Sequence, residues 1–84
     1  MLNIQYFASL REVLGCSSEA LALPADVSSV ATLVAHLAAS RGASWETLLD
    51  VTQVLVAVNQ TIVDRSHPLT GAEEVAFFPP MTGG

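Results

Sequence analysis

Residues 75–84 read Val75-Ala76-Phe77-Phe78-Pro79-Pro80-Met81-Thr82-Gly83-Gly84, a short apolar stretch followed by two prolines and a Gly-Gly end. Residues 75–78 combine β-branched and aromatic side chains, which favours a strand paired in a sheet. Pro79 has no N–H to donate, and Pro80 keeps the residue before it extended, so the strand must end there. The stretch therefore predicts a sheet whose last strand presents the end of the chain.

The two terminal glycines indicate what that end is for. Gly83 and Gly84 carry no side chain, so they fit a channel that is too narrow for other residues. Four extended residues span at most roughly 14 Å, which is enough to enter a buried site on another protein. We therefore expect a domain over residues 1–80 and a flexible tail, Met81, Thr82 and Gly83, that presents the carboxylate of Gly84. The alternative is an accidental glycine terminus.

The composition predicts one small domain with apolar surface to spare. The chain has 84 residues, of which 51% are hydrophobic and only 13% charged. Eight acidic residues against three arginines give a net charge of −5, which is unfavourable for binding nucleic acid. No apolar run approaches the roughly 18 residues of a membrane span, and no signal peptide is visible. With Cys16 as its single cysteine, we expect a cytoplasmic protein without a disulfide framework.

The N-terminal half predicts two strands and one helix. Residues 1–8 alternate in polarity, which indicates a half-buried strand with Phe7 as an aromatic on its polar face. Residues 9–14 predict a turn or short helix closed by Gly15, and residues 18–23 a second strand stopped by Pro24. Residues 30–41 have helical periodicity. We expect this helix to begin with Ser28 or Ser29 as its N-cap and to end at Gly42 in a left-handed conformation. Arg41 would then lie at the negative end of the helix dipole.

The C-terminal half predicts three further strands. Residues 44–50 indicate a short helical turn carrying Trp45, and residues 53–59 a buried strand. A tight turn at Asn59-Gln60 leads into a short strand over residues 61–63, and a polar connection over 64–74 leads into the last strand. The pattern is that of an α+β fold with one helix on a sheet.

The alternation also predicts a partner surface. If the first and last strands pair in parallel with Val75 and Phe77 inside, then Phe7 and Phe78 both point outward beside the tail. Exposed aromatics are typical anchors of protein interfaces. The expected interface consists of Phe7, Phe78, Pro79 and Pro80, with Arg11 as a polar companion. The alternatives are that the 9–15 segment covers one phenylalanine and that Arg11 is only solvated.

The residues do not indicate an ordinary active site. His36 falls within the helix, His67 precedes a proline, and Cys16 has no base beside it in sequence. Glu73-Glu74 is typical of a solvated turn, and no glycine-rich loop opens a helix to hold a phosphate. We expect no metal site and no cofactor bound by the chain itself.

The sequence resembles the small, sulfur-carrying subunit of molybdopterin synthase, a ubiquitin-like family of the MoaD type. The similarity covers nearly the whole chain, and the ending Phe-Phe-Pro-Pro-x-Thr-Gly-Gly is its most specific part. Met81 stands where the family often has valine, and residues 71–74 replace a more aspartate-rich turn. The resemblance implies a β-grasp fold, with a mixed sheet of about five short strands covered by one main helix. Its other matching segments are Tyr6–Glu12 with Gly15, Val56–Thr61, and His67–Thr70.

The resemblance also implies a chemistry at Gly84. A partner enzyme would use ATP to adenylate its carboxylate, and a sulfur donor would then displace the nucleotide to leave a thiocarboxylate. The tail would enter the large subunit, in an assembly of two copies of each, and donate sulfur to cyclic pyranopterin monophosphate. The chain would then have no active site of its own. The alternatives are a thiamin-pathway sulfur carrier, a ubiquitin-like modifier conjugated to other proteins, and a domain that binds partners without covalent chemistry.

Overall fold

The computed structural model describes residues 1–80, which form five strands, two α-helices and one 3-10 helix, η1. Within this part of the chain, no helix is both long enough and apolar enough to cross a membrane. The elements are, in chain order, β1 (Leu2–Tyr6), α1 (Ser9–Leu14), β2 (Ser18–Leu21), α2 (Val30–Arg41), η1 (Ala43–Leu49), β3 (Leu55–Val58), β4 (Thr61–Val63) and β5 (Glu74–Phe78).

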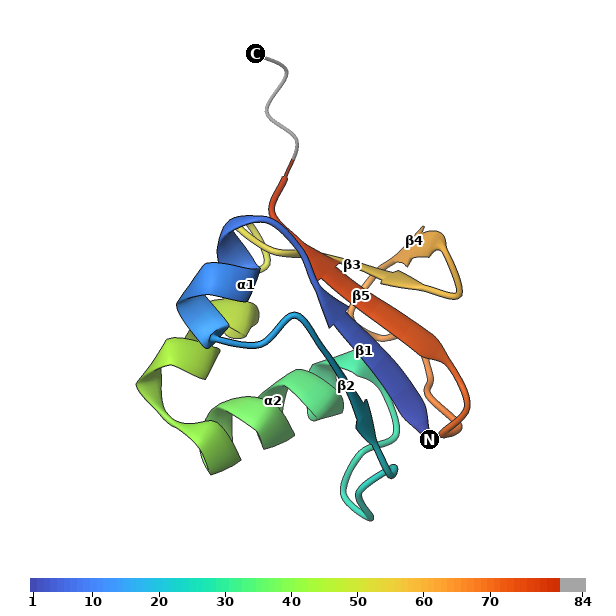
Figure 1. The fold of residues 1–84 in the computed structure, drawn as a ribbon. Coiled ribbons are helices and arrows are strands. Elements are labelled where there is room, and N and C mark those ends of the chain that lie inside the picture. Colours follow the sequence, from blue (N-terminus) through green and yellow to red (C-terminus); the bar gives the residue numbers. More distant parts are fainter. Residues whose placement is uncertain (81–84) are drawn as a thin grey trace.

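The strands form one mixed sheet in the order β2-β1-β5-β3-β4. β1 and β5 lie next to each other and run parallel, whereas the other neighbouring pairs are antiparallel. α2 packs across one face of this sheet, and α1 and η1 cover the same side at one end (Figure 1). The expected β-grasp fold and the parallel pairing of the first and last strands are both confirmed.

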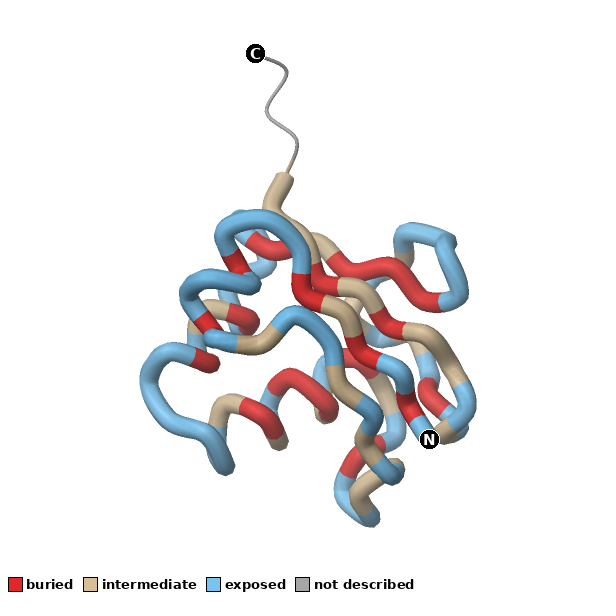
Figure 2. The backbone as a smooth tube through the Cα atoms, viewed as in Figure 1, coloured by how far each residue is buried: buried red, intermediate tan, exposed pale blue. Residues whose placement is uncertain are grey.

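The core lies between α2 and the inner face of the sheet. Burial alternates along β1 and β5, so that one face of each strand is fully buried (Figure 2). α2 contributes a stripe spaced three and four residues apart, as its sequence predicts. No polar or charged residue of the described chain is fully buried. The largest fully buried side chains are Tyr6, Phe77, Leu2, Ile4, Leu33, Leu37, Leu48, Val30, Val34, Val54 and Val75.

The start of α2 confirms one expected cap, and its end corrects another. Ser29 is the N-cap, and its side chain accepts a hydrogen bond from the N–H of Thr32, whose hydroxyl bonds back to the N–H of Ser29. The expected left-handed stop at Gly42 is wrong, because Gly42 has φ 96° and ψ −167°. η1 begins at the next residue and packs against α2, so the chain turns sharply at Gly42. Only the positive φ, which glycine tolerates, agrees with the expectation.

Strand ends differ from the expected bounds by one or two residues. β2 ends at Leu21 rather than at residue 23, because its pairing with β1 stops at Leu2. β3 begins at Leu55 rather than at residue 53, opposite Phe78 of β5. The expected tight turn between β3 and β4 is present, and both of its residues, Asn59 and Gln60, have positive φ.

Four side chains connect the sheet to the end of α2. The hydroxyl of Tyr6 donates to Glu19 at 2.9 Å, and the Arg41 guanidinium donates to both Glu19 oxygens at 2.6 and 2.7 Å. Arg41 also lies 4.5 Å from the centre of the Trp45 ring, which meets Tyr6 edge-on at 5.2 Å. The hydrogen bonds from Arg41 lower the pKa of Glu19, and burial raises the pKa of Tyr6. Arg41 therefore joins elements rather than serving the helix dipole alone.

The expected solvated turn at Glu73-Glu74 is wrong for Glu74, which lies in a strand. Glu74 is the first residue of β5, and Glu73 closes the loop before it. The Glu73 carboxylate accepts hydrogen bonds from the backbone N–H groups of Thr70, Gly71 and Ala72 at 2.9 to 3.1 Å. Desolvation by itself would raise the pKa of Glu73, but these hydrogen bonds outweigh it and lower the pKa from 4.5 to about 2.

We expect Glu73→Gln to lower the melting temperature at neutral pH but not near pH 2. The folded-state pKa of about 2 lies below the unfolded value of 4.5, so the ionised carboxylate stabilises the fold fully above pH 4.5. This stabilisation is lost as the pH falls from 4.5 towards 2. Melting curves of both proteins across this range measure the difference, and a difference that did not change with pH would contradict the assignment.

Candidate functional site

The strand that leads into the tail occupies the middle of the sheet. β5 lies between β1 and β3, and Phe77, next to its last residue, is fully buried. The N–H of Phe7 donates to the carbonyl oxygen of Phe77 at 3.0 Å, which extends the pairing to the strand's end. Pro79 and Pro80 follow and are half-buried. The chain therefore leaves the domain from a fixed point at one end of the sheet (Figure 1).

The proposed tail residues themselves lie outside the described residues. They are Met81, Thr82, Gly83 and Gly84, and both the expected domain boundary after residue 80 and the role of the Gly84 carboxylate stay predictions. The site can be built only from the surface around Pro80.

The face of the sheet opposite α2 carries an apolar surface next to the tail exit. In the sheet register, Phe78 lies opposite Leu55, and Ala57 lies between Ala76 and Ile62. Cross-strand neighbours of this kind share a face and are close enough to contact each other. Phe7 follows β1 on the same face by alternation. We call this the outer apolar surface, and it consists of Phe7, Leu55, Ala57, Ile62, Ala76 and Phe78.

The structure places the predicted interface residues around this exit. Phe7 is 44% exposed, so the α1 segment leaves it accessible, whereas Phe78 is half-buried. Arg11 is exposed on α1, which begins after Ala8. Ala8 has φ 54°, a value that a residue with a side chain rarely adopts, and this sharp turn sends α1 away from β1 directly after Phe7. The structure brings these residues to one end of the domain, and whether a partner contacts them stays a prediction.

The two large side chains of β3 and β4 in the outer apolar surface were missed by sequence reasoning. Ile62 is 66% exposed on β4, and Leu55 begins β3. The run Val54 to Val58 is apolar at every position, so its sequence did not show which side chains face outward. Ile62 lies between Thr61 and Val63 in a three-residue strand, so its side chain points to the opposite face from theirs. This alternation identifies the outer face only when the register between β3 and β4 is known.

The rest of the outer face is polar. A shallow groove of about 380 Å³ runs over β2, β1 and the start of β5. The polar residues of its lining are Asn3, Gln5, Ser18, Glu19 and Glu74. The outer face therefore divides into a polar corner, far from the tail, and an apolar part beside it.

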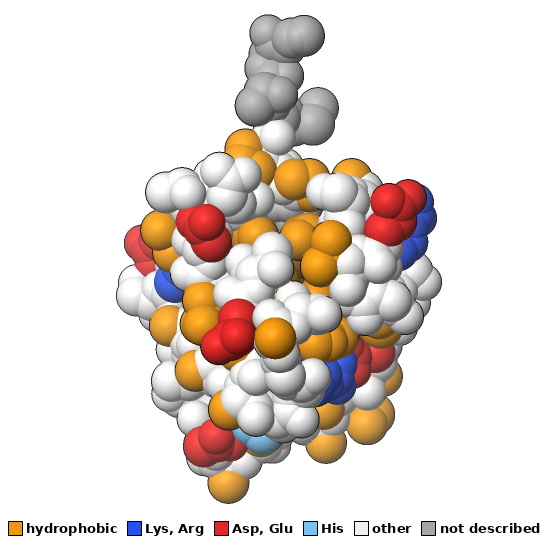
Figure 3. Space-filling model, turned by 90° about the vertical axis from the view of Figure 1, so that its left-hand side faces the viewer, with side chains coloured by type: hydrophobic (Ala, Val, Ile, Leu, Met, Phe, Trp, Pro, Cys, Tyr) orange, Lys and Arg blue, Asp and Glu red, His pale blue; other side chains and the backbone are white. Residues whose placement is uncertain are grey.

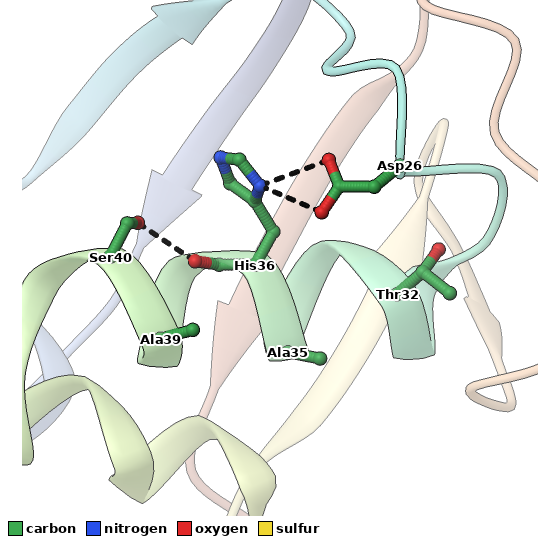
Figure 4. A pocket seen from close by; sticks show the side chains of 6 residues that line it. All are labelled: Asp26, Thr32, Ala35, His36, Ala39 and Ser40. Carbon is green, nitrogen blue, oxygen red and sulfur yellow. Dashed lines mark hydrogen bonds and ion pairs between the residues drawn. The ribbon is translucent and has the colours of Figure 1, made fainter.

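A hollow on α2 does not have the character of a site. It measures about 450 Å³ and includes Asp26, His36 and Ser40 in its lining (Figure 4). His36 Nδ1 contacts the Asp26 carboxylate at 3.2 Å, and Ser40 donates to the carbonyl oxygen of His36 at 2.7 Å. These polar groups bond to each other and to the backbone rather than pointing together at an open position. The hollow also lies on α2, away from the end that carries Pro80 (Figure 1).

The other residues considered from the sequence have structural surroundings. Trp45 is buried, as expected for a core residue. Cys16 is half-buried, with its sulfur 3.5 Å from the carbonyl oxygen of Ser18 and 4.0 Å from the Glu19 carboxylate. Among residues 1–80, no three His, Cys, Asp or Glu side chains come together as metal ligands would.

Known proteins resemble the chain along its whole length. It is 44% identical to the molybdopterin synthase sulfur carrier subunit of Escherichia coli K12, in a match that covers all of this chain and all of that one. It is 38% identical to the protein of the same name from Haemophilus influenzae, again over all of both chains. Both matches therefore run from one end of this chain to the other.

A solved structure shares the fold. The putative molybdopterin converting factor subunit 1 of Pyrococcus furiosus superimposes with a TM-score of 0.72 at 24% identity, over 95% of this chain and 97% of that one. Residues 4–84 match the ThiS family. The matched range contains every strand and helix described above, apart from the first two residues of β1. The chain therefore belongs to the ThiS family.

Proposed function

We propose that this chain is the sulfur carrier subunit of a molybdopterin synthase and that its Gly84 carboxylate carries the sulfur. The observation that carries the proposal is full-length identity of 44% and 38% to two proteins named molybdopterin synthase sulfur carrier subunit. The central position of β5 supports it, because a tail rooted in the middle of the sheet starts from a well-ordered base.

The chemistry at Gly84 needs activation by a partner. A carboxylate is a poor electrophile because its leaving group would be oxide. In the adenylating partner, a carboxylate oxygen attacks the α-phosphorus of ATP and releases pyrophosphate. A sulfur nucleophile from a donor then attacks the acyl carbon and displaces AMP, which leaves a thiocarboxylate. In the large subunit, this sulfur attacks a carbon of cyclic pyranopterin monophosphate and displaces an oxygen from it. Water then cleaves the acyl–sulfur bond, which leaves the sulfur on the pterin and restores the Gly84 carboxylate. The adenylating partner binds the ATP, and we place this sulfur transfer in the cytoplasm.

The large subunit docks on the outer apolar surface in this proposal. That surface begins at Phe7 and Phe78, where the chain leaves the domain, and it extends across β3 to Ile62. Ile62 and Phe7 are large side chains that remain 66% and 44% exposed in the free domain. Burial of such side chains favours association and places the tail's root against the partner. The assembly contains two copies of each subunit.

We expect Phe78→Ala to weaken binding to the large subunit by at least roughly tenfold while the melting temperature falls only a few degrees. Phe78 is half-buried on the outer face, whereas its neighbour Phe77 is fully buried in the core. Titration calorimetry with the purified large subunit, beside thermal melts of both proteins, separates the two effects. A large loss of stability with unchanged affinity would assign Phe78 to the core instead.

The intact mass of the untagged chain tests the chemistry directly. Chain incubated with the adenylating enzyme, ATP and a sulfur donor should acquire a fraction in which one oxygen is replaced by sulfur. Addition of one oxygen to Met1, Met81 or Cys16 increases the mass by nearly the same amount as this replacement. Accurate mass and fragmentation must therefore place the change on Gly84. A chain lacking Gly84 is the matched control. Plain carboxylate in every sample would refute the carrier proposal.

A further inference from the structure

The end of η1 and the connection that follows it to β3 expose two large apolar side chains. Leu49 is 50% exposed and Val51 is 60% exposed, although they are only two residues apart. Both lie in residues 49–54, which we call the 49–54 loop. Single exposed apolar side chains are common on protein surfaces, but two on one short loop form a local apolar patch.

The backbone of this loop is held firmly from both sides. The Arg65 guanidinium donates to the carbonyl oxygens of Leu48 and Val54, the latter at 2.9 Å, and so joins the two ends of the loop. Inside it, the Asp50 carboxylate accepts from the N–H and hydroxyl of Thr52 at 2.9 and 2.6 Å, and the N–H of Val54 donates to the carbonyl of Asp50 at 3.0 Å. The loop is therefore ordered before it meets a partner, which reduces the entropy lost on binding.

The loop lies at the end of the domain from which the tail leaves. It runs directly into Leu55, which pairs with Phe78 at the end of β5. Val51 and Leu55 also line one shallow, mostly valine-lined groove of about 320 Å³ with Val63. Viewed from the side of α1, the end of the molecule around Pro80 shows hydrophobic side chains (Figure 3).

The length of the remaining chain restricts where a partner can sit. Four residues follow Pro80, and when fully extended they span at most roughly 14 Å. A protein that takes Gly84 into a buried site must therefore close against this end of the domain. It then covers the residues around Phe78. These include Leu55 of the outer apolar surface and the 49–54 loop, which runs directly into Leu55.

We propose that the 49–54 loop is a second docking surface for the large subunit, which would contact Leu49 and Val51 with an apolar surface beside its entrance for the tail. This inference rests on the proposed function. A second contact surface that continues from Leu55 would fix the direction in which the tail enters more tightly than the outer apolar surface alone. Arg65 is a positioning residue in this arrangement, because it holds the loop without contacting the partner.

The test compares the double variant Leu49→Ser, Val51→Ser with the wild type and with Ala35→Ser, an exposed apolar-to-polar change on α2. We expect the double variant to bind the large subunit at least roughly tenfold more weakly in titration calorimetry, and Ala35→Ser to bind like the wild type. Melting temperatures should stay close to wild type in both, because all three side chains are exposed. Arg65→Lys should weaken binding less than the double variant, because it loosens the ends of the loop but removes neither apolar side chain.

The outcomes separate this inference from the proposed function. Suppose that the wild type carries sulfur and that both proteins bind the large subunit with equal affinity. This result would refute the 49–54 loop as a docking surface and leave the carrier role intact. If the double variant lost self-association but bound the large subunit as before, the 49–54 loop would contact a second copy of this chain. That result would also refute the loop as a docking surface for the large subunit. A wild type that fails to bind the large subunit would overturn both proposals.

Discussion

Gly83→Val is expected to remove sulfur transfer by the chain and to leave its folding unchanged. The two branched methyl groups of valine widen the tail at the residue before the reactive carboxylate, so the terminus no longer fits a narrow channel. A misplaced reacting group loses at least about a hundredfold in rate, and exclusion from the channel loses more. Single-turnover transfer from chemically prepared thiocarboxylate to the large subunit, measured beside a thermal melt, gives both quantities.

Met81→Val is the matched control for this change. It introduces the same side chain two residues earlier in the tail, at a position that already carries a large side chain. We expect its transfer rate to stay within a few-fold of wild type. Gly83→Ala should fall between the two valine variants. Retained transfer in Gly83→Val would refute the idea that the tail threads through a narrow channel, whereas equal losses in both valine variants would mean that the whole tail is recognised by its side chains.

Tyr6→Ala is expected to produce the largest loss of stability, about 3–5 kcal/mol, because it removes a fully buried aromatic ring from the core. The ring stacks on Phe77 with centroids 5.8 Å apart and meets Trp45 edge-on. Its hydroxyl also binds Glu19. Since small domains are stable by only about 5–15 kcal/mol, much of the margin would be lost. Denaturation in urea, followed by circular dichroism, measures the change.

Tyr6→Phe separates the ring from the hydroxyl. It keeps the packing and removes one hydrogen bond to Glu19, whose carboxylate still has both bonds from Arg41. We expect a loss of about 1 kcal/mol. If Tyr6→Phe destabilised the protein as much as Tyr6→Ala, the polar network rather than the core packing would dominate here. Neither change touches the outer face, so the affinity of the folded fraction for the large subunit should be preserved.

Much of the fold could be predicted because its signals are local. The alternation of Leu2, Ile4 and Tyr6, the helical spacing in residues 30–41 and the glycine after α1 each depend on neighbours within a few residues. The conformation of Gly42 could not be predicted in this way. Its dihedral angles depend on where η1 packs, and that contact is set by the whole core.

The site was only partly predictable for the same reason. Phe7 and Phe78 could be assigned to one face from alternation, but their separation depends on how β1 and β5 pair. Ile62 joined the outer apolar surface only through its register with Ala57. The hydrogen bonding of the Glu73 carboxylate was not predicted, because three of its four donors are backbone N–H groups, which a sequence does not distinguish.

The sequence by itself determined the elements, the strand that ends at Pro79 and the family, because propensity, periodicity and motifs are properties of short segments. Only the tertiary structure decided which surfaces lie beside the tail exit. The contacts between Leu55 and Phe78, and between Arg65 and the ends of the 49–54 loop, join residues 11 to 23 positions apart. Such contacts follow from how the strands pair and how the core packs, so they exist only once the whole domain has folded.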